Sequence, residues 1–285
     1  MSTSDKFTGK NEPTWCPGCG DYGILMALKM ALEKANAVPE NTLIVFGIGC
    51  SGNMSNWVNT YGFHGLHGRP LPVATGAKLA NHDLLVIAEG GDGDGYGIGI
   101  SHFIHACRRN IDITYIVHNN QIYGLTTGQT SPTSEKGFIS QSTPHGSIEM
   151  PINPLALAIT SGATYVARGY AGHVRHLAEL IAQGIAHKGF ALIDVLQPCF
   201  TFNHVNTYDF FKKRVYKLED HGYTPTNRQK ALLKTLEWGE KIPIGLFYKE
   251  HRKTYGDELP QIAKKPLVKQ NIARKNVKPL MKKLV

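Results

Sequence analysis

The chain has 285 residues, of which 42% are hydrophobic and 30 are glycine, and it contains no apolar run of eighteen residues. Length and composition therefore exclude a membrane-spanning protein, and the short polar start, which lacks the apolar centre of a secretory signal, predicts a cytoplasmic α/β protein with one large core. The formal net charge is +9, but eleven of the 31 basic residues and only three of the 22 acidic ones lie from Lys249 onward, so the excess belongs to a C-terminal tail and we expect no nucleic-acid partner.

The first part of the chain combines cysteines with a predicted helix and strand. Cys16 and Cys19 form the sequence Cys-Pro-Gly-Cys-Gly, and residues 21–34 follow with helical spacing. Residues 42–46 are a short β-branched run typical of a strand, after which Cys50 stands in Gly-Ile-Gly-Cys-Ser-Gly. Three cysteines thus lie in glycine-containing loops next to predicted core elements, where metal ligands can converge.

A polar segment rich in glycine occupies residues 59–76. It contains His64, His67 and Arg69, side chains that can orient a cofactor, a substrate carboxylate or a proton. Two of these residues also have a structural explanation: His64 can equally be a hydrogen-bonded structural histidine, and Arg69 can pair with a carboxylate of a neighbouring chain.

The centre of the chain predicts one βαβ unit with a polar motif after each strand. Residues 84–89 and 111–117 are apolar, β-branched runs, and residues 98–109 between them have the length of a helix. Gly91-Asp92-Gly93 follows the first strand and Asn119-Asn120 follows the second. If the strands are parallel neighbours, both motifs emerge at their carboxyl ends, where open α/β sheets bind ligands.

These two motifs together predict a magnesium site beside a diphosphate. Magnesium takes one or two protein oxygens plus phosphate and water oxygens, and Asp92, the Asn120 side chain and the Ile122 carbonyl would meet that demand. Either motif alone is more simply a turn. The pair, placed after two strands, favours the binding site.

The second half of the chain reads mainly as scaffold. Strands at 163–167 and 191–196 flank a helix near 173–187, which is again the βαβ order. A threonine-capped helix is expected at 226–240 and a final edge strand at 242–248.

Two loops before this scaffold carry polar groups. In the loop 124–133 we expect ligand contact at Gly124 and Leu125, with turn chemistry as the alternative for the hydroxyl residues. The loop 135–150 is long for a compact domain, which is typical of a functional loop or of one covered by another chain.

Cys199 follows the predicted strand 191–196 and completes a set of four loop cysteines with Cys16, Cys19 and Cys50. Four thiolates suit an iron–sulfur cluster and equally suit a structural zinc ion. Because only one close Cys-x-x-Cys pair exists, spacing alone leaves zinc, cluster and no metal open. Cys107, on the predicted helix 98–109, is expected to be a buried apolar residue.

The runs 90–99 and 119–126 resemble the thiamine-diphosphate signature, in the form found in the β subunits of 2-oxoacid:ferredoxin oxidoreductases. The order of the four cysteines is similar to that family as well, and the resemblance extends over residues 12–248. It implies an α/β thiamine-diphosphate-binding fold, a mostly parallel sheet flanked by helices, in a domain 1–248. Residues 249–285 lie outside the resemblance; their basic charge and their prolines favour an arm laid over a partner subunit, with a disordered tail as the alternative.

The resemblance also implies cofactors and the residues that hold them. These are one [4Fe-4S] cluster on Cys16, Cys19, Cys50 and Cys199, thiamine diphosphate, and a magnesium ion on Asp92, Asn120 and Ile122, with His67 near the reacting atoms and His64 as a weaker candidate. The implied cofactor-binding residues are Ile48, Gly49, Cys50, Ser51, His67, Gly91, Asp92, Gly93, Asp94, Asn120, Ile122, Gly124 and Leu125.

The activity implied is the coenzyme-A-dependent oxidative decarboxylation of 2-oxoglutarate, or its reverse, with electrons passed to ferredoxin. Pyruvate is the alternative substrate. A non-redox thiamine-dependent decarboxylase and a non-catalytic metal-binding protein are the rival functions. No glutamate stands in a motif that matches the one thiamine enzymes need, so we expect an α subunit to supply it, in an αβ or (αβ)2 enzyme, and the isolated chain to be inactive.

Overall fold

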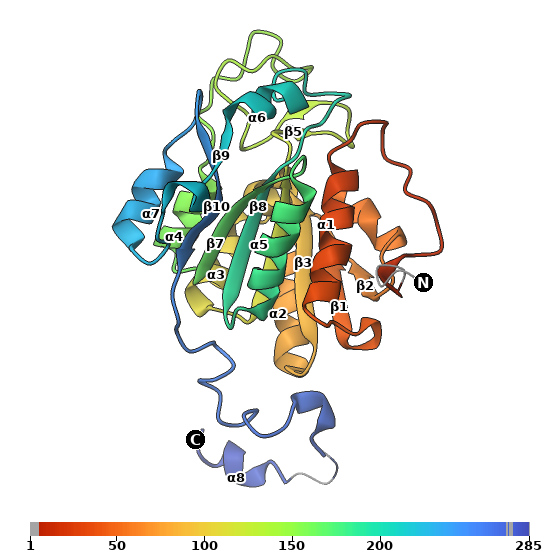
Figure 1. Ribbon diagram of the computed structural model, residues 1–285. Coiled ribbons are helices and arrows are strands. Elements are labelled where there is room, and N and C mark those ends of the chain that lie inside the picture. Colours follow the sequence, from red (N-terminus) through yellow and green to blue (C-terminus); the bar gives the residue numbers. More distant parts are fainter. Residues whose placement is uncertain (1–5, 272, 274–275, 285) are drawn as a thin grey trace.

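The computed structural model describes residues 6–271, 273 and 276–284, and its centre is an eight-stranded sheet (Figure 1). The first five residues of the expected domain 1–248 and four residues of the expected arm lie outside the described residues. In spatial order the strands are β2 (Tyr61–His64), β1 (Thr42–Phe46), β3 (Leu85–Gly91), β4 (Ile113–Asn119), β8 (Phe190–Leu196), β7 (Tyr165–Tyr170), β10 (Ile242–Lys249) and β9 (Val215–Lys217).

The sheet is mostly parallel, because only the pair β7–β10 is antiparallel. Strands β3 and β4 are parallel neighbours, in a register that places Gly91 opposite His118. The motifs that follow these two strands therefore leave the sheet at the same edge. The predicted α/β class and the predicted βαβ unit are both confirmed.

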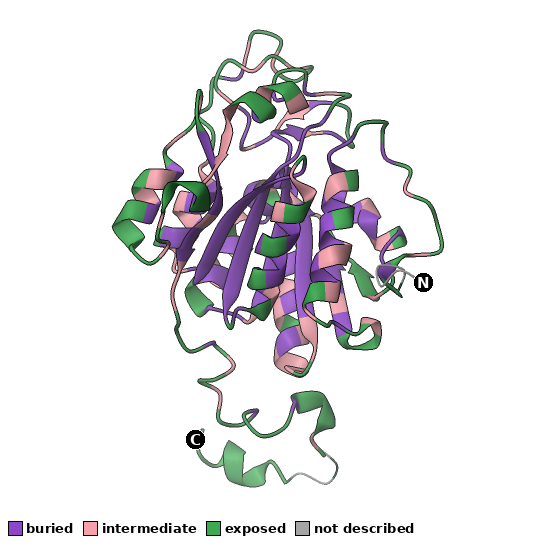
Figure 2. Cartoon of the chain, viewed as in Figure 1, coloured by how far each residue is buried: buried purple, intermediate pink, exposed green. Residues whose placement is uncertain are grey.

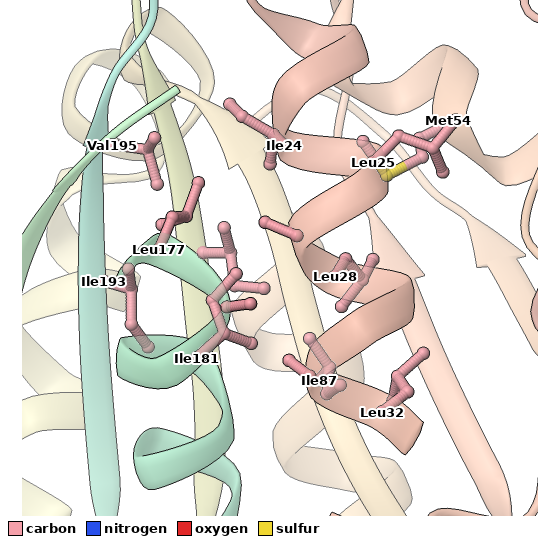
Figure 3. Packing of buried hydrophobic residues seen from close by; sticks show 14 of the residues in the cluster. Ile24, Leu25, Leu28, Leu32, Met54, Ile87, Leu177, Ile181, Ile193 and Val195 are labelled. Atoms are coloured by element: carbon pink, nitrogen blue, oxygen red, sulfur yellow. The ribbon is translucent and has the colours of Figure 1, made fainter. Parts of the chain in front are cut away.

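Helices α1 (Asp21–Lys34) and α5 (Val174–Ala186) cover one face of the sheet (Figure 1). Figure 3 shows the apolar side chains of α1, among them Leu28, meeting Ile181 of α5 and Ile87 of the sheet. These side chains are fully buried. Each contributes about 1.5–3 kcal/mol of burial free energy, and together they fix α1 over the sheet's centre.

The other face is covered by α2 (Pro70–Ala80), α3 (Ile100–Arg109), α4 (Pro154–Thr160) and α7 (Arg228–Thr235). Alternate residues of one strand serve the two faces: Ile116 packs with α1 and α5, whereas Tyr115 and Val117 pack with α3. The central strands are buried on both faces (Figure 2), as expected of parallel strands covered by helices.

Two predictions in the second half were wrong. Strand β10 is not at an edge, because it pairs with β7 on one side and with β9 on the other. Strand β9 has only three residues, too few for a recognisable alternation. The helix predicted at 226–240 is the shorter α7, and its first turn is capped by Asn227, whose side chain accepts from Lys230 N at 2.9 Å, rather than by a threonine.

No described helix is both long and apolar enough to cross a membrane.

The C-terminal segment and several short elements complete the fold. From Lys249 the chain runs below the amino ends of the strands, with Ile262 buried and Lys269 Nζ 2.7 Å from Asp83 Oδ2 (Figure 1). The remaining elements are β5 (Ile122–Tyr123), β6 (Gln129–Thr130), α6 (Tyr208–Arg214), α8 (Lys278–Met281), the π-helix η4 (Gly93–Ile98) and the 3-10 helices η2 (Pro39–Asn41), η3 (Ser51–Asn56), η5 (Glu219–His221) and η6 (Leu267–Lys269).

Candidate functional site

The loops at the carboxyl ends of β1, β3, β4 and β8 enclose a cavity of about 280 Å³, which we call the Asp92 cavity. Every cofactor-binding residue predicted from the sequence lies in its wall. The lining residues are Ile48, Gly49, Cys50, Ser51, His67, Gly91, Asp92, Gly93, Asp94, His118, Asn120, Ile122, Tyr123, Gly124, Leu125, Thr126 and Gln197.

A second cavity of about 110 Å³, the cysteine cavity, adjoins the first. Its wall holds all four loop cysteines, although they come from widely separated parts of the sequence, whereas Cys107 is a residue of α3 that is buried in the apolar core. The lining residues are Thr14, Trp15, Cys16, Cys19, Cys50, Asn53, Asn120, Leu125, Gln197, Cys199, Phe200, Thr201 and Phe202. Cys50, Asn120, Leu125 and Gln197 belong to both walls, so the two cavities share a partition.

Asp92 is a buried carboxylate held by two hydroxyl groups. Ser131 Oγ and Thr133 Oγ1 each donate to Asp92 Oδ2 at 2.5 Å, and Thr133 Oγ1 also lies 2.9 Å from Asn119 Oδ1. Burial raises the pKa of Asp92 to about 6, although these hydroxyl hydrogen bonds lower it. A cation beside the carboxylate would offset the cost of burial. In the sequence these hydroxyl residues are equally typical of turns, and only their position beyond the predicted metal ligands signals a role.

The Asn119-Asn120 turn presents an amide oxygen at the same edge. Asn120 Oδ1 accepts from Ile122 N at 3.0 Å, and Gln121 adopts a left-handed backbone with φ 59°. Asn120 and Ile122 both line the Asp92 cavity. The three predicted magnesium ligands are thus brought to one cavity wall, each with an oxygen atom to offer.

Asp94 joins three loops through one carboxylate. Its Oδ1 accepts from Ile48 N at 3.0 Å, from Gly68 N at 2.8 Å and from His67 Nδ1 at 2.9 Å. Burial raises the pKa of Asp94, and the donors from Gly68, Ile48 and His67 lower it. With Nδ1 directed at the carboxylate, His67 keeps Nε2 for the cavity.

The structure does not place His64 with this group. The residue lies at the exposed end of β2 and is not in the wall of the Asp92 cavity. A Cβ atom added at Gly52 would lie 3.0 Å from its Nε2, so its ring packs against η3. The catalytic role considered for His64 stays a prediction.

A buried group of three ionisable residues includes His118, which lies in the wall of the Asp92 cavity, and no local sequence pattern predicts this group. His118 Nδ1 lies 2.6 Å from Asp21 Oδ1. On the other side of the ring, His118 Nε2 lies 2.9 Å from Glu89 Oε1, and this contact is an ion pair whose geometry does not meet the angles of a hydrogen bond. Burial lowers the pKa of His118, but the Glu89 and Asp21 carboxylates prevail and raise it to about 10. The two carboxylates therefore favour the protonated form of His118. In the sequence this residue directly follows the apolar run 111–117 and looks like an ordinary core residue.

A second buried network supports the Asn119-Asn120 turn from below. Asp194 Oδ1 accepts from Tyr96 Oη at 3.0 Å and from Asn119 Nδ2 at 3.1 Å. The Arg168 guanidinium lies near Asp194, with Nε 3.6 Å from Oδ2, and packs on the ring of Trp238. Because Asn119 also meets Thr133, this network continues to the Asp92 carboxylate.

The four loop cysteines surround the space of the cysteine cavity. Among the residues described, no group of three His, Cys, Asp or Glu side chains is arranged to hold a metal ion. A Cβ atom added at Gly124 would lie 3.5 Å from Cys50 Sγ and 3.6 Å from Cys199 Sγ, so the glycine keeps the space between these sulfurs open. Thiols are ligands of zinc ions and of iron–sulfur clusters alike, and the cysteine cavity offers four of them.

Two family models match the chain, and together they cover most of it. The model described as "Thiamine pyrophosphate enzyme, C-terminal TPP binding domain" matches residues 47–195. The model for the C-terminal region of the pyruvate ferredoxin oxidoreductase beta subunit matches residues 199–264. The first match contains the Asp92 and Asn120 motifs, and the second begins at Cys199.

Among curated relatives, the 2-oxoacid:ferredoxin oxidoreductase subunit beta of Saccharolobus solfataricus is 51% identical over 246 residues, which cover 82% of this chain and 81% of that protein. The 2-oxoglutarate oxidoreductase subunit KorB of Mycobacterium tuberculosis is 45% identical over 207 residues, covering 73% of this chain and 55% of that protein. Among solved structures, the 2-oxoglutarate:ferredoxin oxidoreductase from Magnetococcus marinus, with 2-oxoglutarate, coenzyme A and succinyl-CoA bound, is similar with a TM-score of 0.91 and 37% identity, covering 99% of this chain and 96% of that chain.

Proposed function

The chain belongs to the family of 2-oxoacid:ferredoxin oxidoreductase β subunits, which work with an α subunit, and on that basis we propose its substrate, its metals and its electron acceptor. The reaction is the oxidative decarboxylation of 2-oxoglutarate with coenzyme A, or the reverse carboxylation, and the electrons leave through a [4Fe-4S] cluster to ferredoxin. The observation that carries this proposal is the partition shared by the Asp92 cavity and the cysteine cavity.

The choice of 2-oxoglutarate is supported by the names of similar proteins. The KorB relative is a 2-oxoglutarate oxidoreductase, and the structure from Magnetococcus marinus contains 2-oxoglutarate and succinyl-CoA. Pyruvate remains the second candidate substrate, because the description of the family model that matches residues 199–264 names pyruvate.

The Asp92 cavity is proposed to hold the diphosphate end of thiamine diphosphate with a magnesium ion. Asp92, Asn120 and the Ile122 carbonyl would be the protein ligands of the ion. The Ser51 hydroxyl, buried at the cavity wall without a partner among the described residues, is free to donate to a bound group. Thiamine diphosphate supplies the electron sink that decarboxylation of a 2-oxoacid needs. His67, held by Asp94, would accept or donate a proton at Nε2.

The cysteine cavity is proposed to hold the cluster on Cys16, Cys19, Cys50 and Cys199. A [4Fe-4S] cluster supplies one-electron transfer, and thiolates are its ligands. Cys50 and Leu125 line both cavities, so the two cofactors would be separated by single side chains. Cys16 is exposed, which gives a surface from which ferredoxin can take electrons.

The remaining parts of the proposal concern the partner subunit. The acidic residues in the wall of the Asp92 cavity are Asp92 and Asp94, and no glutamate lies among its described lining residues, so the catalytic glutamate is assigned to the α subunit. Leu125, in the walls of both cavities, and Phe200, in the wall of the cysteine cavity, expose 52% and 64% of their surface and would contact that subunit. Residues 1–248 form the catalytic domain of a cytoplasmic αβ or (αβ)2 enzyme, and residues 249–285 form an arm that lies on a partner subunit.

One preparation tests this proposal. The αβ complex is co-expressed and purified without oxygen, and its contents of iron, acid-labile sulfide, zinc and thiamine diphosphate are measured. In the presence of coenzyme A and ferredoxin, its reaction rates on 2-oxoglutarate, pyruvate and 2-oxobutyrate are then determined. We expect iron and sulfide in equal amounts and the highest rate with 2-oxoglutarate. Zinc in place of iron would indicate a non-redox decarboxylase, and absence of both thiamine diphosphate and turnover would indicate a metal-binding protein without this activity.

A further inference from the structure

Gln197 is a buried residue in the partition between the two cavities. It follows β8 directly, and its backbone N–H donates to Asn119 O at 3.0 Å, which continues the pairing of β8 with β4. The residue is 1% exposed and lines both cavities. The main chain therefore fixes its position next to the Asn119-Asn120 turn on one side and the cysteines on the other.

The Gln197 side chain reaches a cysteine that is far away in the sequence. Its Nε2 donates to Cys19 Sγ at 3.3 Å and also lies 3.3 Å from Pro198 O. The stem of the side chain is held by Gly20, where an added Cβ atom would lie 2.8 Å from Gln197 Cγ. Close backbone packing thus holds the amide group against the sulfur.

The sulfur of Cys19 has an unfavourable environment for negative charge. The thiol is buried, and it donates to Asp21 Oδ2 at 3.4 Å. A thiolate at this position would face a carboxylate on one side. The amide N–H of Gln197 is the group that would stabilise it on the other side.

We propose that Gln197 is a positioning residue that raises the reduction potential of the cluster at the four cysteines by donating a hydrogen bond to the Cys19 sulfur. The inference rests on the cluster in the proposed function. One-electron reduction adds negative charge that is shared by the sulfur ligands, so a donor to sulfur stabilises the reduced form more than the oxidised form. In the partition, this makes the cluster a better acceptor for electrons released on the other side.

The test compares three variants in the co-expressed αβ complex, purified without oxygen. Gln197→Met keeps the length of the side chain and removes the donor; Gln197→Glu keeps the shape and replaces the donor by a carboxylate. Gln121→Met is the matched control, because Gln121 is also buried but its Nε2 donates to Thr133 O at 2.9 Å rather than to sulfur. Iron and sulfide are measured first, and the midpoint potential is then determined by reductive titration with dithionite, followed by electron paramagnetic resonance.

We expect wild-type iron content in all three variants and potentials that fall in the order wild type, Gln197→Met, Gln197→Glu. Loss of one hydrogen bond to a charged group should change the ratio of reduced to oxidised cluster roughly tenfold at a given potential, which is about 59 mV for one electron. Gln121→Met should keep the wild-type potential.

An unchanged potential in a Gln197 variant that holds its iron would overturn the inference. Loss of iron from both Gln197 variants, with iron kept in Gln121→Met, would also overturn it, because the residue would then be needed for cluster assembly rather than for its potential. Wild-type complex without iron or sulfide is a separate result, which removes the proposed function itself.

Discussion

Both ends of the central sheet contain buried polar side chains, but the partners of these side chains differ between the two ends. At the amino end, Lys78 Nζ pairs with Asp112 Oδ2 at 3.0 Å, and Thr164 Oγ1 lies 2.7 Å from both Asn110 Oδ1 and His187 Nε2. Most of these groups bond to one another, although Lys78, Asp112 and His187 also line a cavity of about 310 Å³ and His187 Nδ1 has no partner among the described residues. At the carboxyl end, Asp92 and Ser51 face a cavity, and Ser51 has no partner among the described residues.

This contrast separates a structural polar cluster from a binding site. Burying a polar group is costly unless it is paired, so a set of mutually satisfied groups is explained by the fold alone. A buried carboxylate with a raised pKa at a cavity wall, as at Asp92, is explained by a ligand. Variants at the two ends should therefore affect different quantities: cofactor binding at the carboxyl end, and stability at the amino end.

The largest expected effect is at Asp92. Asp92→Ala should weaken magnesium-dependent binding of thiamine diphosphate by more than roughly 100-fold, beyond the range typical of residues that only support a metal ligand. Titration calorimetry of the αβ complex measures this. The matched variant at the amino end, Asp112→Asn, should keep the affinity. If Asp92→Ala loses iron together with thiamine diphosphate, the division into two cavities is wrong.

The second effect concerns the cysteines. Cys199→Ser should lose most of the iron of the complex, because it removes a thiolate from the cysteine cavity. Cys107→Ser should keep full iron occupancy, since Cys107 is enclosed in the apolar core. Iron and acid-labile sulfide assays on both purified variants decide this, and equal iron loss in the two would refute the assignment.

A smaller effect is expected at Thr133, which supports Asp92 rather than binding the metal. Thr133→Val removes the hydroxyl that lies 2.5 Å from Asp92 Oδ2, and it should weaken magnesium affinity by roughly 10-fold. Thr164→Val, an equally buried hydroxyl at the amino end, should leave that affinity unchanged and lower the free energy of unfolding by about 1–3 kcal/mol. The reverse pattern would mean that the two ends do not differ as described.

The smallest effect is a dependence of stability on pH at the amino end. Burial, with Lys249 and His251 nearby, lowers the pKa of His187 to about 4, from the usual value of about 6.5. The folded state therefore binds the proton more weakly than the unfolded state, and the stabilisation present above a pH of about 6.5 is lost as pH falls toward 4.

Between about pH 7 and pH 5.5 this histidine should cost roughly 1 kcal/mol of unfolding free energy, measured by urea denaturation. The free energy of unfolding is plotted against pH for the wild type and for His187→Gln, and the difference between the two slopes gives the contribution of this residue. Identical slopes would show that His187 does not titrate in this way.

Those parts of the fold and site that leave a local pattern could be predicted from the sequence. Strands β3 and β4 are continuous apolar runs, and the motifs at Asp92 and Asn120 directly follow them, so the meeting of these motifs could be predicted once the strands were taken as parallel neighbours. The edge position of β9 could not be predicted in this way, because three residues show no alternation.

Other parts of the site depend on contacts between distant segments. Asp21 and His118 meet across 97 residues, and Cys19 and Gln197 across 178. Each of these residues has an ordinary local setting: a helix start, a strand end or a loop. Their role is visible only when α1 lies over the sheet, since the packing of α1 determines which groups they meet.

The arrangement of two cofactors across one partition is tested most directly by a crystal structure of the αβ complex with thiamine diphosphate, with anomalous diffraction data collected at the iron absorption edge. We expect iron density among Cys16, Cys19, Cys50 and Cys199, separated from the thiamine diphosphate in the Asp92 cavity by the partition that contains Gln197. Iron density at another place, or no iron beside an occupied Asp92 cavity, would show that this arrangement is wrong.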